Sequence, residues 1–474
     1  MRQTKTVGFA SKHTSSIKGF IISPPKPLKQ RILKAGIWIF GGHASAHVIR
    51  LISNLIMTRL LVPEMFGLMS IVSVLIMGLS LFSDLGLRQS IIQSKRGRDE
   101  RFLNTIWSFQ IIRGFSIWGF SALVAIGVYI AQLLQWMPAN TVYAEPLLPL
   151  IIPVSTLGMI IGAFEPTWTA LASRDLQQAR LVKIDLICQI TGVIAMVSMA
   201  FYSRSIWALV LGSLISGISR SIIVNFIIKE KRNHFEIDKT YISEIFHFGK
   251  WIFLSSIIGF LAMNGDKLLL GGLISTNDLG VYNIASFMIG AVATIVSRLL
   301  GGVAYPALSE TVRDRPYDLH RIYYRFRLPF DAGIMFLAGL LFASGQTIIQ
   351  LLYDSRYEDA GWMLNVLALS LIALRYNLAD QSYMALGKPK MMTMLTLTRT
   401  VALFVFLPIA YNQFGLHGAI WAIVGSYFSS FPMAIYYKKT HQLLDIKKEL
   451  ITLPMIFVGL ACGLIFNKIV QIMF

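Results

Sequence analysis

The sequence predicts an all-α integral membrane protein made of two pseudo-symmetric six-helix lobes and one additional C-terminal helix, with about 13 spans. Three observations predict it. Of the 474 residues, 55% are hydrophobic and 14% are charged, whereas a soluble chain carries about 25% charged residues. Apolar runs of about 20 residues, the length that crosses a bilayer, recur along the chain. Two parts of the sequence, offset by 213 positions, also share a pattern.

Thirteen apolar runs are long enough to span a membrane. They cover residues 36–57, 66–83, 104–130, 147–168, 181–202, 206–228, 250–273, 279–303, 328–352, 361–386, 391–411, 416–437 and 450–473. Several contain Gly or Pro, which membrane helices tolerate better than soluble helices do. A fourteenth span is the alternative that this count leaves open.

The distribution of Lys and Arg predicts the orientation of these spans. Of the 43 basic residues, 32 fall in alternate connections and in the N-terminal segment, and the connections of the opposite side hold only Arg59, Arg204 and Arg356. Basic residues gather on the cytoplasmic side of membrane proteins. We therefore expect a multi-pass membrane protein with a cytoplasmic N-terminus, and no nucleic-acid partner despite the net charge of +19.

An internal repeat predicts the domain organisation. At an offset of 213 residues, the segment 60–69 lies over 273–282, and Gly67 lies over Gly280. Parallel repeats of this kind imply a pseudo-twofold axis along the membrane normal. The predicted parts are listed in chain order: a basic cytoplasmic tail (1–34), a first lobe (35–228), a cytoplasmic linker (229–249), a second lobe (250–440) and an additional C-terminal span (441–474).

Polar residues form a line along the first apolar run. His43, His47, Arg50 and Asn54 are spaced four, three and four residues apart, which places them on one face of a helix. An arginine in the middle of a span is costly unless it faces protein or water. The stripe therefore predicts either contact with another helix or one wall of a polar cavity.

Cations outnumber anions within the predicted spans. Six lie away from span ends: Arg50, Arg113, Arg220, Lys267, Arg375 and Arg399. Facing lipid, they would cost roughly 15–20 kcal/mol together, more than the ~5–15 kcal/mol net stability of a typical domain. We therefore expect them to face inward. Arg298 and Lys468 lie near predicted span ends, where a long side chain can reach the interface.

Few carboxylates are available to pair with these cations. Asp266 is adjacent to Lys267, and Asp380 follows Arg375. The excess of cations predicts a cavity that binds an anion, and Arg suits phosphate because its planar fork makes paired hydrogen bonds. Arg50, Arg375 and Arg399 are the first candidates for substrate contact, followed by Arg113, Arg220 and Lys267. His43, His47, Asn54, Asp266 and Asp380 are candidates for cavity lining or ion coupling.

The loops argue against an enzyme. The longest connection on the outer side has about a dozen residues, and a soluble catalytic domain needs at least about 50. The two cysteines, Cys188 and Cys462, lie inside apolar runs, so they predict neither a disulfide framework nor a metal site. No cofactor is expected.

Several segments jointly resemble one family, the polysaccharide transporter family of Wzx-type oligosaccharide flippases. The similar segments are Thr58 to Gly67, Asp84 to Gln93, the region around Ser173 to Leu176, Asn264 to Gly271, Leu279 to Asn283, and Tyr305 to Ser309. The resemblance runs from about residue 32 to 440. It implies a two-lobed, drug-exporter-like fold within the multidrug/oligosaccharidyl-lipid/polysaccharide superfamily.

The same resemblance implies a function. The expected substrate is a polyprenyl-pyrophosphate-linked oligosaccharide, moved across a bacterial cytoplasmic membrane for exopolysaccharide, capsule or O-antigen assembly. A polysaccharide polymerase and glycosyltransferases are the expected protein partners. The alternatives are an ion-coupled multidrug antiporter, a peptidoglycan-precursor flippase and a membrane polymerase or ligase.

Overall fold

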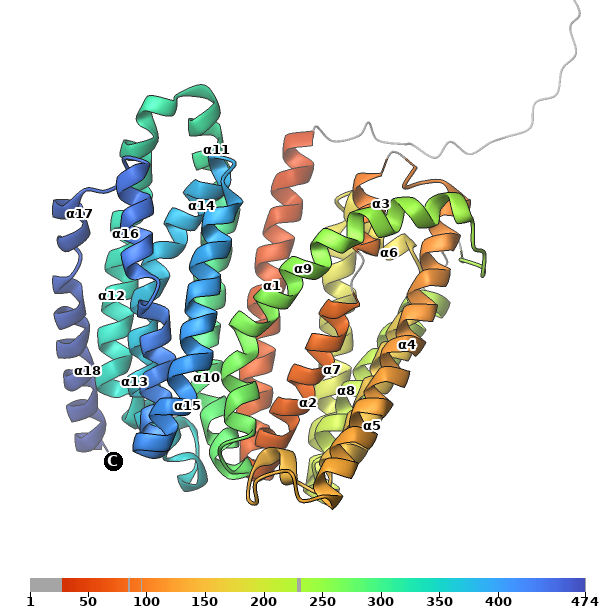
Figure 1. Ribbon diagram of the computed structural model, residues 1–474, viewed down its shortest axis with the longest axis horizontal. Coiled ribbons are helices and arrows are strands. Elements are labelled where there is room, and N and C mark those ends of the chain that lie inside the picture. Colours follow the sequence, from red (N-terminus) through yellow and green to blue (C-terminus); the bar gives the residue numbers. More distant parts are fainter. Residues whose placement is uncertain (1–27, 84–85, 95, 228–231, 474) are drawn as a thin grey trace, which may run out of the picture.

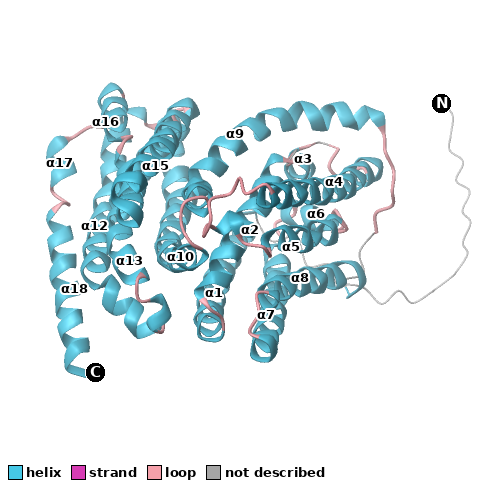
Figure 2. Cartoon of the chain, turned by 60° about the horizontal axis from the view of Figure 1, so that its bottom comes forward, coloured by secondary structure: helices cyan, strands magenta, loops and turns pink. Residues whose placement is uncertain are grey.

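The computed structural model describes residues 28–83, 86–94, 96–227 and 232–473. Every regular element in these ranges is a helix (Figure 2). Nine helices of the described chain are long and apolar enough to cross a membrane, or ten if the pair Leu148–Ala163 and Trp168–Arg174, bent by 69°, forms one span. The predicted all-α membrane class is confirmed, and the number of 13 spans stays a prediction.

The first half of the chain forms six long helices with short ones between them. In order they are α1 (Leu28–Leu60), α2 (Pro63–Phe82), α3 (Leu87–Gln93), α4 (Glu100–Leu133), η1 (Val142–Ala144), α5 (Leu148–Ala163), α6 (Trp168–Arg174), α7 (Gln178–Ser203), α8 (Trp207–Ile222) and η2 (Ile223–Ile227). Local sequence explains several starts. Pro63 occupies the first turn of α2, where a missing N–H costs nothing. Asp99 caps α4 by accepting a hydrogen bond from the Arg101 N–H.

The second half repeats this organisation and extends it. Its helices are α9 (Lys239–Gly271), α10 (Thr276–Leu299), η3 (Leu300–Ala304), α11 (Tyr305–Asp314), η4 (Pro316–Asp318), α12 (Leu319–Leu352), η5 (Ser355–Tyr357), α13 (Ala360–Ala368), η6 (Leu369–Tyr376), α14 (Asn377–Ala385), α15 (Pro389–Phe428), α16 (Phe431–Thr440), α17 (Ile446–Leu450) and α18 (Pro454–Met473). Gly415 interrupts α15 with a left-handed φ of 61°. This break falls between the predicted spans 391–411 and 416–437.

Two boundaries differ from those expected from the sequence. The first helix begins at Leu28, so residues 28–34 are helical, while residues 1–27 of the expected tail lie outside the described residues. The helix α9 begins at Lys239, so the second half of the expected linker is helical, and α9 packs against both α2 and α15. Hydropathy does not mark these starts because polar residues continue the helices beyond the apolar runs.

The helices form two groups that lie side by side (Figure 1). In the first half, α4 packs on α5, α7 on α8, and α1 on α7, and in the second half α12 packs on α18 and α13. We call the end with α3, α6, α11 and α17 the upper end and the opposite end the lower end, as Figure 1 draws them. The largest hydrophobic core includes residues of both groups, such as Met57, Ile71, Val281 and Tyr357.

The two groups meet where α2 crosses α10. A Cβ atom on Gly67 would lie 2.0 Å from the carbonyl oxygen of Thr276, and one on Gly280 would lie 1.9 Å from that of Pro63. Gly67 and Gly280 are related by the offset of 213 residues, and so are Pro63 and Thr276. A contact that is reciprocal in this way is what a twofold relation between two similar surfaces produces. It supports the predicted repeat, and it explains why both positions are glycine.

Candidate functional site

Hydrogen bonds join the two groups at the lower end. Arg356, in η5, donates from Nη2 to the carbonyl oxygens of Thr58 (2.9 Å) and Arg59 (3.3 Å) at the end of α1. Tyr353 donates its hydroxyl to Asn54 Oδ1 at 3.1 Å. From the other group, the Tyr143 hydroxyl donates to the carbonyl oxygen of Leu268 at 2.9 Å. The lower end is therefore closed by contacts that each half makes to the other.

The predicted stripe on α1 lies above this closure. His43 and Arg50 are exposed, and His47 and Asn54 are partly buried. The positive charge of Arg298 on α10 acts on both His43 and His47, and the carboxylate of Asp185 on α7 also acts on His43. Only Asn54 is engaged in the closure. The structure thus brings together His43, His47 and Arg50 with a cation from the other lobe.

Arg298 is the functional candidate that sequence reasoning missed. Its position near a predicted span end suggested that it reaches the membrane surface. In the structure α10 continues through η3 into α11, as far as Asp314, so Arg298 is not at a helix end. The sequence beyond residue 303 could have indicated that the helix continues. Tyr305 to Asp314 contains helix-forming residues, and its Pro306 stands in the first turn, where helices tolerate proline.

Neither Arg50 nor Arg298 has a carboxylate within ion-pair distance in the described part of the chain. We call His43, His47, Arg50 and Arg298 the inter-lobe cation cluster. Because an uncompensated cation in a membrane interior is unfavourable, this cluster is suited to an anionic ligand.

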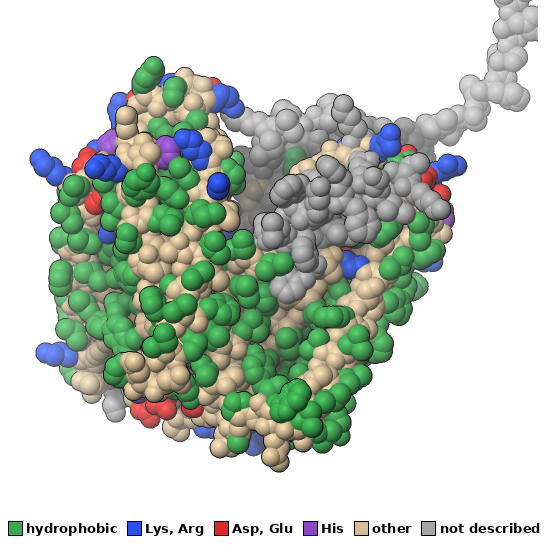
Figure 3. Space-filling model, in the orientation of Figure 1, with side chains coloured by type: hydrophobic (Ala, Val, Ile, Leu, Met, Phe, Trp, Pro, Cys, Tyr) green, Lys and Arg blue, Asp and Glu red, His purple; other side chains and the backbone are tan. Residues whose placement is uncertain are grey.

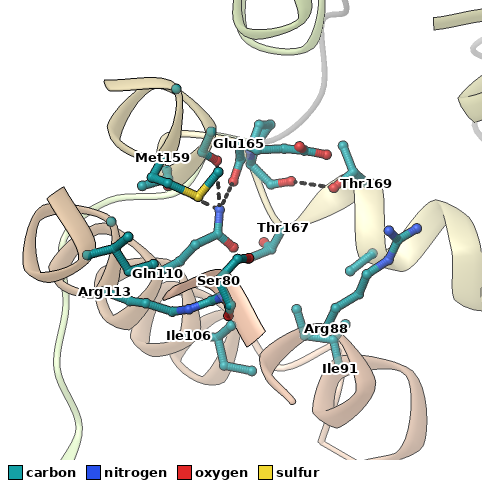
Figure 4. Close-up of a pocket in the computed structure, with 17 residues that line it drawn as sticks. Ser80, Arg88, Ile91, Ile106, Gln110, Arg113, Met159, Glu165, Thr167 and Thr169 are labelled. Carbon is teal, nitrogen blue, oxygen red and sulfur yellow. Dashed lines mark hydrogen bonds between the residues drawn. The ribbon is translucent and has the colours of Figure 1, made fainter. Parts of the chain in front are cut away.

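Arg113 lies in a separate pocket within the first half. This pocket has a volume of about 240 Å³, and Figure 4 shows Arg113 extending along it toward Ser80. Its guanidinium donates to the Ser80 carbonyl oxygen (2.7 Å) and to Ser83 Oγ (3.0 Å). Ser80 lies in the last turn of α2 and Ser83 caps its end, so Arg113 compensates the carbonyls and the negative end of that helix.

Gln110 has a similar role in the same pocket. Its amide donates to the carbonyl oxygens of Gly162 and Ala163, at the end of α5, and of Glu165, just beyond it (Figure 4). The two polar side chains that point into this pocket from α4 therefore stabilise helix ends. Arg88, which also lines it, donates to Ser173 Oγ at 2.7 Å.

Arg220 is paired with two carboxylates. It makes a two-pronged contact with Glu165, at 3.0 and 2.9 Å, and a further ion pair with Asp185. Glu165 follows α5 and Asp185 belongs to α7, so the arginine ties three helices of the first lobe. A cation with two carboxylate partners has no excess charge for a substrate.

Arg375 also lies away from the inter-lobe cation cluster, because it belongs to a buried ionic cluster. Arg375 is 6% exposed and contacts Asp331 (3.2 Å) and the Glu449 carbonyl oxygen (2.7 Å). Arg327 binds Asp331 at 2.9 Å, and Lys438 binds the Glu449 carboxylate. These five residues, from α12, η6, α16 and α17, join the upper ends of four segments. The structure therefore gives Arg375 a structural role.

Lys267 and Asp266 bind different residues of α10. Lys267 donates to Asn283 Oδ1 at 3.0 Å, and Asp266 accepts a hydrogen bond from the Tyr282 hydroxyl. These two adjacent residues of α9 therefore both bind α10, and within the described chain they do not form an ion pair with each other.

Arg399 and Asp380 lie within the second lobe. Arg399 donates from Nε to Ser430 Oγ at 2.7 Å, and its charge acts on Asp380. Asp380 is 9% exposed, and its Oδ1 atom has no hydrogen-bond partner in the described chain. The structure thus brings these two predicted residues near each other.

The geometry is that of a membrane transporter with two lobes. The lobes are joined at the lower end, and polar side chains lie between them above this closure. The chain belongs to the family described as polysaccharide biosynthesis protein, whose model matches residues 56–362. The resemblance found in the sequence is thereby confirmed, as are the membrane transport class and the place in polysaccharide biosynthesis.

Individual proteins agree with this assignment. A putative O-antigen transporter of Shigella flexneri is 23% identical over 417 residues, covering 83% of this chain and 94% of that protein. An uncharacterized membrane protein in the cps region of Klebsiella pneumoniae is 22% identical over 408 residues, covering 84% and 79%. The solved structure of the Lipid II flippase MurJ in an inward closed conformation matches with a TM-score of 0.64 and 15% identity, covering 92% and 98%. This last likeness shows a shared fold.

Proposed function

We propose that the chain is a flippase that moves a polyprenyl-pyrophosphate-linked oligosaccharide across the cytoplasmic membrane by alternating access. The inter-lobe cation cluster is the observation that carries this proposal. Arg50 and Arg298 belong to different lobes, both act on His47, and neither has a carboxylate within ion-pair distance among the described residues; a pyrophosphate bears the complementary charge. The lipid tail of the substrate stays in the bilayer while the lobes rock about the bound head group.

The relatives support the substrate class. The Shigella relative is named for O-antigen transport and the Klebsiella relative for the cps region, and both fit a lipid-linked oligosaccharide as cargo. The peptidoglycan precursor has the same pyrophosphate group, so the cation cluster alone does not separate the two cargoes. The relatives' names favour the oligosaccharide.

We further propose that the upper end faces the cytoplasm. Lys and Arg gather at this end in Figure 3, in agreement with the bias toward cytoplasmic basic residues. On this assignment the closed lower end faces outward, and the structure corresponds to an inward-facing state that accepts cargo from the cytoplasmic leaflet. Residues 35–228 and 250–440 would be the two moving lobes. Glycosyltransferases would act on the substrate before transport, and a polymerase would act on it afterwards.

The proposal predicts that Arg50→Ala and Arg298→Ala each reduce polymer export at least tenfold. Loss of one charge-assisted contact with a phosphate corresponds to about 1.5–3 kcal/mol. Export is measured as surface polysaccharide in cells that depend on this gene, with protein level in the membrane measured in parallel.

The matched control is Arg204→Ala, which removes an exposed arginine at the lower end of α7 and should leave export unchanged. Normal export by both cluster variants at normal protein levels would contradict the proposed site. A defect in peptidoglycan synthesis with unchanged surface polysaccharide would instead identify the peptidoglycan precursor as cargo.

A further inference from the structure

A second site lies on the flank of the first lobe, away from the second lobe. It is a groove of about 490 Å³ between α4, α5 and α8, lined by apolar side chains that include Trp107, Phe164, Ile218, Ile222 and Phe226. Figures 1 and 2 both place α4, α5 and α8 on the side of the molecule opposite the second lobe. We call this site the flank groove.

The walls of the flank groove face the bilayer. Ile218, Ile222 and Phe226 are 43%, 47% and 67% exposed, and Phe164 is 40% exposed. These residues belong to predicted spans, so the exposed apolar surface is in contact with lipid chains. A flexible acyl chain makes more van der Waals contacts in a concave apolar groove of this size than on the flat face of a helix.

One end of the flank groove is polar and carries one cation, Arg232. Asn225 donates to the Phe164 carbonyl oxygen (3.2 Å), and Asn233 accepts hydrogen bonds from Thr167. Arg232 is exposed, and its guanidinium lies 5.6 Å from the centre of the Phe226 ring. In the part of the chain that the structure describes, Arg232 has no carboxylate within ion-pair distance.

We propose that the flank groove binds one anionic phospholipid of the leaflet at the upper end. An acyl chain occupies the apolar groove, and the phosphate of the head group meets Arg232 at its rim. The arrangement has both parts that such a lipid requires, an apolar channel in the membrane and a cation at the level of the head groups. The ring of Phe226 holds the guanidinium at this position.

The substrate's polyprenyl tail is the alternative occupant, and the position of the groove argues against it. Cargo bound by the inter-lobe cation cluster lies between the lobes, whereas the flank groove opens on the distant side of the first lobe. The phospholipid proposal does not depend on the proposed transport function.

Trp107 provides the reporter for a test. The full-length protein is reconstituted in vesicles of phosphatidylcholine with brominated acyl chains, which quench tryptophan fluorescence on contact. Unbrominated phosphatidylglycerol is then added in increasing proportion. Subtracting the signal of a Trp107→Phe chain isolates the contribution of Trp107 from those of the other tryptophans.

We expect phosphatidylglycerol to relieve the quenching of Trp107 at a proportion roughly fivefold lower than dilution alone predicts, the effect of one arginine on anionic lipid. Arg232→Gln should abolish this preference. Arg321→Gln, at an exposed arginine of α12 in the other lobe, is the matched control and should retain it. Ile222→Phe, which narrows the groove without adding a tryptophan, should weaken the preference with Arg232 in place.

Two results would overturn the proposal. One is an equal response to phosphatidylglycerol and unbrominated phosphatidylcholine in the wild-type chain, or a preference that survives Arg232→Gln. The other is relief of quenching by polyprenyl phosphate but not by phosphatidylglycerol, which would assign the groove to the cargo's tail.

Discussion

The buried ionic cluster at the upper end of the second lobe depends on one carboxylate, that of Glu449. Its side chain binds Arg327 and Lys438 and accepts a hydrogen bond from the Tyr324 hydroxyl at 2.9 Å. Arg327 and Lys438 are both 0% exposed. With Asp331 the cluster holds three cations and two anions, so one positive charge is in excess, and loss of one anion raises the excess to two. Breaking such a network is strongly destabilising even where its formation adds little stability.

Glu449→Gln should therefore reduce the free energy of unfolding by about 3–5 kcal/mol. The reason is that the neutral amide no longer balances Arg327 and Lys438. The measurement is the thermal unfolding midpoint of the purified protein in detergent. Lys448→Gln changes the neighbouring residue, whose ion pair with Asp445 is half-exposed, and should cost about 0–1 kcal/mol. Equal stability of Glu449→Gln and the wild type would show that the cluster is not a structural anchor.

Helix packing depends on glycines at two crossings. At the lower end, Gly67 and Gly280 allow α2 and α10 to touch backbone to backbone. At the other crossing, Gly459 and Gly463 of α18 lie against α12, where a Cβ on Gly459 would be 2.1 Å from the Phe336 carbonyl oxygen. Small residues permit such close approach in membranes, where helix association relies on packing. The additional helix α18 is thus held on the second lobe by close backbone packing against α12, whereas α17 is held there by the ion pairs of Glu449.

Gly280→Ala should weaken the lower closure, because its methyl group overlaps the Pro63 carbonyl and forces α2 and α10 apart. We expect a loss of about 1–3 kcal/mol, the usual cost of overpacking. It is measured by thermal unfolding and by labelling of a cysteine introduced at Ser53, with Cys188 and Cys462 replaced by Ser.

Gly290→Ala lies in the same helix with nothing within 4 Å of its added Cβ, and it should leave both signals unchanged or raise stability slightly. If the Gly280 and Gly290 variants behave alike, the close crossing does not hold the lower end shut.

Hydrogen bonds between the two halves close the whole molecule at its lower end. Arg356 and Tyr353 of the second half bind the end of α1, and Tyr143 of the first half binds the end of α9. These bonds are few, and the Arg356 side chain is 37% exposed. A small number of hydrogen bonds of this kind can favour the closed conformation while still allowing the lower end to open.

Arg356→Gln should shift the chain toward the outward-open state about tenfold. It removes charge-assisted hydrogen bonds to Thr58 and Arg59 worth about 1.5 kcal/mol at a partly exposed site. The population is measured by spin-label distances between the lower ends of α2 and α13 in lipid. Arg204→Gln is the control at the same end of the molecule. An unchanged distance distribution in Arg356→Gln would exclude this arginine from the closure.

The sequence determined the helical membrane class, the repeat and the excess of cations within the spans. These follow from hydrophobic runs, from a constant offset and from residue counts, which are properties of the chain itself. It also determined that Gly67 and Gly280 are equivalent, although not that they touch. The stripe on α1 followed from helical spacing alone, and its members lie where that spacing places them.

Only the tertiary structure decided which cations are compensated. Arg220 and Arg375 look like Arg50 in the sequence, but their carboxylates come from Glu165, Asp185, Asp331 and Glu449, which are 35 to 74 residues away. Arg298 looked like a residue of the membrane surface until its helix proved to continue. The physical reason is that the charge balance of a buried group depends on distance in space, and hydropathy records only the surroundings of a residue along the chain.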